Sequence, residues 1–266
     1  MPRLWFRSAL VLAAAAAPIL GIAALSQGCG STTVDEDAGP DGGEADADAG
    51  AQPVVTVLHP DAAPLPGQTE CTVTITTNIP VTKAVHVPVC TPVSYATNPP
   101  SGGDHWGVWA AFTTYATPVP REMYVHDMEH GALVLLHDCD GACPEELTAA
   151  LAAAHDQVMG DPLCLQIPGG PSERVLTTPD PLLDTPIAIA AWGATYTATC
   201  IDEASLKAFA KAHYGHGPEQ VCADGKLYGD PDGGAPTCGD AGTGGAGGST
   251  GGTGGSTGGT GGADAG

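Results

Sequence analysis

Two histidines and a glutamate between positions 125 and 131 have the residue types and spacing of a metal site. The segment reads Val-His-Asp-Met-Glu-His-Gly. On a helix, His126 and His130 lie one turn apart on the same side, with Glu129 beside them. Two imidazoles at this spacing bind one transition-metal ion, and the carboxylate acts as third ligand, general base or orienting group. The pattern therefore predicts a copper or zinc site.

Such a site needs further ligands, and His105 is the first candidate. It follows Gly102 and Gly103, which let the backbone approach closely, and its loop precedes the helix. The predicted ligands are therefore His105, His126, Glu129 and His130. Further options are Asp104, His137, His216 and Glu219. Met123 and Met128 flank the histidines and would favour copper, because thioethers are soft ligands, although buried methionines are more often core residues.

Two other functions remain open, so the sequence does not decide whether the protein is an enzyme. The order H-x-x-E-H is that of inverted zinc peptidases, in which Glu129 would activate a metal-bound water beside a cleft. In the other, the imidazoles are hydrogen-bonded packing residues, and the domain is an interaction module with Trp106 and Trp109 at a contact face. Nucleophilic catalysis is weakly supported, since there is no GxSxG motif and Ser101 is a loop serine.

The predicted ligands depend on a helix over 121–130. Pro120 suits its start, Glu122 its positive first turn, and Gly131 the left-handed residue after its end. A second helix runs from Pro144 to just before Gly160. A third follows Asp202, with Leu206, Phe209 and Ala210 directed inward. Strands are predicted at 54–58, 72–77, 85–89, 132–137, 163–167, 174–178 and 187–199, and residues 91–119 form an ordered, aromatic-rich loop. The fold class is α+β with a mixed sheet.

The cysteines predict an oxidising compartment. The chain has nine cysteines. Cys29 is the expected site of a lipid anchor, and the remaining eight allow up to four disulfides. Zinc binding by thiolates is the alternative. The spacing leaves the pairing open, and Cys139 and Cys143 either close a small loop or each reach elsewhere.

Both ends of the chain differ in composition from the middle. Residues 1–28 have Arg3 and Arg7 before an apolar run, which is typical of a secretory signal. The segment ending at Cys29 resembles a bacterial lipoprotein signal, and ordinary soluble secretion is the alternative. Residues 29–52 are an acidic disordered tether and 229–266 a disordered Gly/Thr/Ser-rich tail, so one domain spans 53–228. We expect a lipid-anchored cell-envelope protein held to the bilayer through Cys29.

Charge excludes one class of partner. The chain has 8 Lys and Arg against 30 Asp and Glu, a net charge of −22. Its field repels phosphates, so we expect no nucleic-acid partner.

Five motifs in order resemble one bacterial family, domain of unknown function 3105. They are Tyr95-x-x-Asn98-Pro99-Pro100-Ser101-Gly102-x-x-His105, Pro118-Val119-Pro120, Val125-His126-x-x-Glu129-His130-Gly131, Ala191-Trp192-Gly193 and Gly217-Pro218-Glu219. The resemblance implies that His105, His126, Glu129 and His130 belong to the family pattern, whereas His59, His86, His155 and His213 do not obviously do so. The chain departs from the family at Gly103-Asp104, at Ala132 and in its many cysteines.

Overall fold

The computed structural model describes residues 52–81, 83–139, 142–229, 234–236 and 238. The predicted signal, the tether up to residue 51 and most of the tail lie outside them. The elements, in chain order, are β1 (Val54–Leu58), β2 (Val73–Thr77), β3 (His86–Val87), β4 (His105–Trp106), α1 (Arg121–Glu129), β5 (Leu133–His137), α2 (Glu145–His155), η1 (Cys164–Gln166), β6 (Val175–Pro179), β7 (Ile187–Ala191), β8 (Ala194–Ala198) and α3 (Glu203–His213).

Six strands form one mixed sheet in the order β1-β2-β8-β7-β5-β6. All neighbours are antiparallel except β5 and β6, which are parallel and are connected through α2. β3 and β4 form a separate parallel pair. This arrangement confirms the predicted α+β class with a mixed sheet and three helices.

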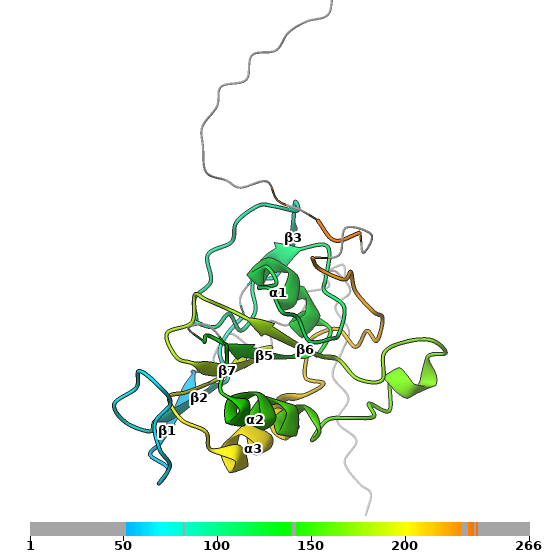
Figure 1. The fold of residues 1–266 in the computed structure, drawn as a ribbon. Coiled ribbons are helices and arrows are strands. Elements are labelled where there is room, and N and C mark those ends of the chain that lie inside the picture. The colour runs from blue at the N-terminus through cyan, green and yellow to red at the C-terminus, as the bar shows by residue number, and fades with distance from the viewer. Residues whose placement is uncertain (1–51, 82, 140–141, 230–233, 237, 239–266) are drawn as a thin grey trace, which may run out of the picture. The chain divides into compact units, whose positions relative to one another are not determined.

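The sheet separates two apolar cores, because successive strand residues point to opposite faces. In β5, Leu133 and Leu135 pack with α2 and α3, whereas Val134 and Leu136 pack with α1. Figure 1 shows α1 on one side of the sheet and α2 and α3 on the other. The two are called here the α1 face and the α2/α3 face.

The helices begin where their sequence signals predict, but α2 ends at His155, earlier than the predicted end before Gly160. Pro120 and Pro144 immediately precede α1 and α2, where a missing backbone N–H costs nothing. Leu206, Phe209 and Ala210 of α3 are buried as expected. Asp202 precedes α3, but its side chain makes no capping hydrogen bond. Buried Trp106, Ala110, Tyr115 and Val119 pack the long aromatic loop onto the α1 face.

Three strand predictions need correction. The segment 163–167 contains the 3₁₀ turn η1 instead of a strand, and just before it the carboxylate of Asp161 accepts a hydrogen bond from the backbone N–H of Leu163, which favours a turn. Residues 187–199 form two strands, because Gly193 has a φ of +70° and completes a two-residue hairpin turn with Trp192. The strand predicted at 85–89 shortens to β3 and pairs with β4 rather than with the large sheet.

Four disulfides are present, as the cysteine count predicts. They are Cys71–Cys200, Cys90–Cys238, Cys139–Cys143 and Cys164–Cys222. Ordered structure continues past residue 228, since Gly234 bridges to Leu227 and Ala235 packs against the core. Among the described residues, no helix is long and apolar enough to span a bilayer.

Candidate metal centre

Helix α1 is the central element of the centre. Seven of its residues, from Met123 to Glu129, are buried, and the helix contacts β4 and β5. Gly131 follows it with a φ of +87°, which turns the chain into β5 at no steric cost. The helix thus holds both polar and apolar side chains away from water.

Three imidazoles meet at the α1 face. The parallel register of β3 and β4 places His86 opposite His105, with ring centroids 5.0 Å apart. The His126 ring comes from α1 and lies 4.7 Å from His86 and 4.8 Å from His105. One ligand atom each from His86, His105, His126 and Glu129 lies within 4.8 Å of all the others. These four residues are called here the His/Glu cluster.

Backbone carbonyls orient two of the imidazoles. The Nδ1 atom of His105 lies 2.8 Å from the carbonyl oxygen of Gly103, and Nδ1 of His126 lies 2.7 Å from that of Trp106. Each contact makes Nδ1 the protonated donor, and in a neutral ring this leaves the lone pair on Nε2. Metal-bound histidines typically donate their second ring N–H in this way.

Glu129 brings a carboxylate against these lone pairs. Its Oε2 lies 3.0 Å from Nε2 of His105 and 3.7 Å from Nε2 of His86. The His105 Nε2 is buried, and its alignment with Glu129 makes no hydrogen bond. A lone pair facing a carboxylate oxygen is repelled, and a proton or metal ion shared by the two atoms removes the repulsion. In tetrahedral zinc sites, neighbouring ligand atoms lie about 3.3 Å apart, close to these two separations.

Burial keeps His126 neutral. Its ring is desolvated, which lowers the pKa of His126 to about 3, while the hydrogen bond to Trp106 opposes the shift and the neighbouring histidines add to it. A neutral imidazole is the form that binds metals. Access from solvent is at His86, whose side chain is 56% exposed.

His130, the remaining predicted ligand, lies next to the cluster rather than within it. Its ring is 4.6 Å from that of His126 and 4.8 Å from that of Trp109. Its Nε2 lies 3.4 Å from Oε2 of Glu219, and its buried Nδ1 has no hydrogen-bond partner among the described residues. Desolvation lowers the pKa of His130, which Glu219 partly opposes. His130 is therefore placed to form a second layer behind His126.

The further ligand options named in the sequence analysis lie outside the His/Glu cluster. Asp104 accepts hydrogen bonds from Lys83 and from the backbone N–H of Val85; the Lys83 contact is the main reason that the pKa of Asp104 is below its usual range. His137 contacts Cys143, and His216 is exposed. Met123 and Met128 are fully buried and pack in the apolar core of the α1 face.

Ser101 and Trp106, considered above as a nucleophile and as a contact residue, are both buried and hydrogen-bonded. Ser101 is buried and its hydroxyl accepts a hydrogen bond from Thr97. Trp106 is 4% exposed and donates its indole N–H to the carbonyl oxygen of Thr91. Trp106 is therefore a core residue, and its proposed place at a contact face was wrong.

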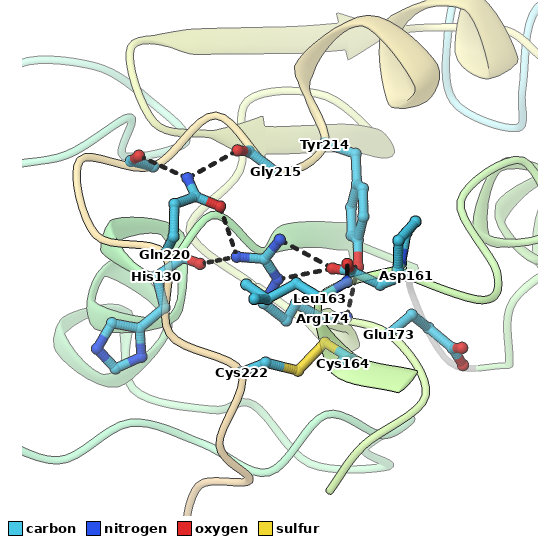
Figure 2. Close-up of polar contacts among 12 residues, drawn as sticks. His130, Asp161, Leu163, Cys164, Glu173, Arg174, Tyr214, Gly215, Gln220 and Cys222 are labelled. Atoms are coloured by element: carbon cyan, nitrogen blue, oxygen red, sulfur yellow. Dashed lines mark hydrogen bonds and ion pairs between the residues drawn. A yellow bond between two sulfur atoms is a disulfide. The ribbon is translucent and has the colours of Figure 1, made fainter. Parts of the chain in front are cut away.

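A buried ion pair supports the end of α1. Figure 2 shows Arg174 between Asp161, the carbonyl oxygen of His130 and the side chain of Gln220. Its Nη2 lies 2.8 Å from Asp161 Oδ2, and Tyr214 donates its hydroxyl hydrogen to the same carboxylate. Burial alone would raise the pKa of Asp161, but hydrogen bonds from Tyr214, Leu163 and Arg174 hold it below its usual range.

The 215–219 segment closes over the same helix end. The N–H of Gly215 donates to Gly131, and the N–H of Glu219 donates to the carbonyl oxygen of Glu129. At Gly217 a Cβ would collide with backbone atoms of Glu129 and Gly131. Only glycine fits there, so this segment packs directly against the end of the helix that carries His126 and Glu129.

Sequence comparison adds a family to this geometry. A family model described as "Protein of unknown function (DUF3105)" matches residues 86–225, more than half of the chain. The chain belongs to this family. The match begins at His86 and includes every residue of the His/Glu cluster. No curated protein and no solved structure matches the chain.

Sequence reasoning set aside His86, the one cluster member outside the predicted ligands. His86 lies near His105 because β3 and β4 pair in parallel, with each residue of β3 opposite the residue 19 positions later in the chain. A local sequence pattern does not reveal this pairing. The only available signal is that each histidine precedes an apolar residue in a segment able to form a strand, His86-Val87 and His105-Trp106.

Proposed function

We propose that this DUF3105 domain binds one transition-metal ion, copper or zinc, at the His/Glu cluster, in an exported protein anchored to the cell envelope through Cys29. The observation that carries the proposal is the orientation of His105 and His126. Backbone carbonyls hold both rings through Nδ1, which leaves Nε2 of each neutral ring as the ligand atom, and both rings lie in a group with a carboxylate and a third imidazole.

The ligand chemistry favours zinc or divalent copper. Three imidazole nitrogens and one carboxylate oxygen are borderline to hard ligands, and no sulfur joins them. The ligand atoms lie within 4.8 Å of one another, and tetrahedral binding requires separations of about 3.3 Å, so the cluster must contract. His86 is the ligand free to make this movement, because it is exposed and lies on a strand of two residues.

Binding is better supported than hydrolysis. Four protein ligands complete a tetrahedral shell, whereas catalytic zinc keeps one position open for water. A peptidase-like mechanism also needs Glu129 as a base apart from the ligands. Its carboxylate instead lies directly against Nε2 of His105.

Export is supported by the four disulfides and by the lipoprotein-like segment ending at Cys29. Expression of the full chain in a bacterial host tests the anchor. The wild type is expected in the membrane fraction with a labelled fatty acid, and Cys29→Ser is expected to lose both. An unlabelled, soluble wild type would contradict the anchor while leaving the metal site untouched.

Competition titration with a chromogenic chelator tests the site on the full chain with its disulfides formed. We expect His105→Ala, His126→Ala and Glu129→Gln each to weaken zinc or copper binding at least about 100-fold, because each removes a ligand. His155→Ala, a histidine on α2, is the matched control and should bind as wild type. Equal affinities across this series would refute the cluster as the site.

A further inference from the structure

A second reactive group lies at the far end of β5, away from the His/Glu cluster. Here Cys139 and Cys143 form a disulfide and His137 ends the strand. Ligand-type atoms of these three residues lie within 4.8 Å of one another, and all three side chains are partly exposed. The metal proposal makes no use of this group.

This disulfide differs from the other three. Those join residues 58 to 148 positions apart, whereas Cys139 and Cys143 are four positions apart. A bridge this short restrains little of the unfolded chain. The other bridges fasten distant segments of the fold, and this one has no comparable structural task.

The two sulfurs have different surroundings. Sγ of Cys143 lies 3.1 Å from Nδ1 of His137. Cys139, in contrast, lines a cavity of about 190 Å³ together with the apolar side chains of Leu65, Leu147 and Pro186. Cys143 is not among the residues that line it. Cys139 therefore borders the cavity, and the sulfur of Cys143 has a ring nitrogen of His137 beside it.

We propose that Cys139–Cys143 is a thiol–disulfide exchange site, in which a thiolate of a partner dithiol attacks Sγ of Cys139 from this cavity. The S–S bond breaks and its electron pair moves to Sγ of Cys143, where the Nδ1–H of His137 stabilises the thiolate. A mixed disulfide then joins Cys139 to the partner. The second thiolate of the partner then attacks the partner sulfur of this mixed disulfide, which releases Cys139 as a thiolate. The partner loses two electrons and becomes a disulfide, and the two cysteines become thiols.

The exchange reaction favours Cys139 as the attacked sulfur and Cys143 as the leaving sulfur. Exchange is faster when the leaving sulfur is the better stabilised thiolate. Burial lowers the pKa of His137, which Asp138 partly opposes, so the ring is neutral near pH 7 and has one N–H to donate. With that proton on Nδ1, the donor faces Cys143.

Glutathione, a monothiol probe, tests the attack on the full chain with its native disulfides. After brief exposure, free thiols are alkylated and the peptides are mapped by mass spectrometry. We expect Cys139–Cys143 to open first, with glutathione on Cys139 and the alkylating label on Cys143. Glutathione on Cys143, or opening of Cys71–Cys200 at the same rate, would overturn the proposal.

Substitution of His137 separates chemistry from simple exposure. His137→Asn is expected to slow opening of the bridge at least about tenfold, while the control His155→Asn leaves the rate unchanged. An unchanged rate in His137→Asn would show that the bridge is only exposed. The position of glutathione in the wild-type protein needs no variant, so it decides the question even if His137→Asn folds poorly.

Discussion

The two faces of the sheet bury different chemistry. On the α2/α3 face, Leu147, Leu151, Leu206 and Phe209 cover the strands with apolar surface. On the α1 face the helix also buries His126, Asp127 and Glu129, against the usual exclusion of such groups from cores. One face follows the rules that make a sequence fold, and the other departs from them. Such departures typically mark functional sites, and this is the face on which the proposed metal site lies.

Asp127 illustrates the cost of the α1 face. Its carboxyl is fully buried, and within the described part of the chain its sole hydrogen-bond donor is the backbone N–H of Ala110, which bonds to Oδ2. Burial raises its pKa well above the usual range. A helix selected for stability alone would carry an apolar residue at this position.

The largest expected effect concerns Arg174, which supports the α1 face. Arg174→Met leaves Asp161 buried without its cation, and we expect a loss of about 3–5 kcal/mol in the free energy of unfolding. Denaturant unfolding of the full chain measures it, with the exposed Lys211→Met as control. A loss below about 1 kcal/mol would mean that this ion pair does not hold the end of α1.

On the opposite face, Leu135→Ala sharpens the contrast. Leu135 is fully buried against α2 and α3, and its truncation should cost about 2–5 kcal/mol. Metal affinity of the folded variant should stay within about twofold of wild type, because distant sites behave independently. A parallel loss of metal affinity, measured by the same chelator competition, would break the division between the faces.

A smaller effect is expected at the short disulfide. Replacing Cys139 and Cys143 together by serine should cost about 2 kcal/mol, against about 5 kcal/mol for the pair Cys71 and Cys200, because the closed loops differ so much in length. Thermal unfolding compares the two double variants. Equal losses would give the short bridge a structural role and weaken its assignment to exchange chemistry.

The smallest effect is the acid response of Asp161. Because the folded pKa lies below the unfolded value of about 3.8, its contribution to stability is complete above that pH and disappears as the pH falls through the folded pKa. Unfolding free energy should therefore fall below pH 4. Asp161→Asn should show a shallower decline there, and an identical decline in both proteins would contradict the role of the network in Figure 2.

The fold was predictable where its signals are local. Pro120, Pro144 and Gly131 mark the ends of helices, and a continuous apolar run marks β5 as a buried strand. What sequence could not supply was long-range. The pairing of β3 with β4, the disulfide connections and the hairpin at Gly193 depend on contacts between distant segments or on a single turn inside an apolar run.

In the candidate site, too, the local arrangement could be predicted from the sequence and the long-range contacts could not. His126 and Glu129 lie on α1 and His130 follows directly as its C-cap residue, so helical spacing predicted that they lie together. Spacing did not reveal that His130 turns towards Glu219 while His86 takes a place beside Glu129. The position of His130 depends on the 215–219 segment, and that of His86 depends on β3. In the sequence, these two segments lie near opposite ends of the region that matches the family model, residues 86–225.

Metal content of the exported full chain tests the central claim most directly. The protein is purified without chelators and analysed by elemental mass spectrometry beside a His126→Ala/Glu129→Gln double variant whose disulfides and secondary structure are verified. The account predicts close to one copper or zinc ion per chain in the wild type and none in the variant. A wild-type protein that holds neither metal, even after incubation with excess copper and zinc, would contradict it.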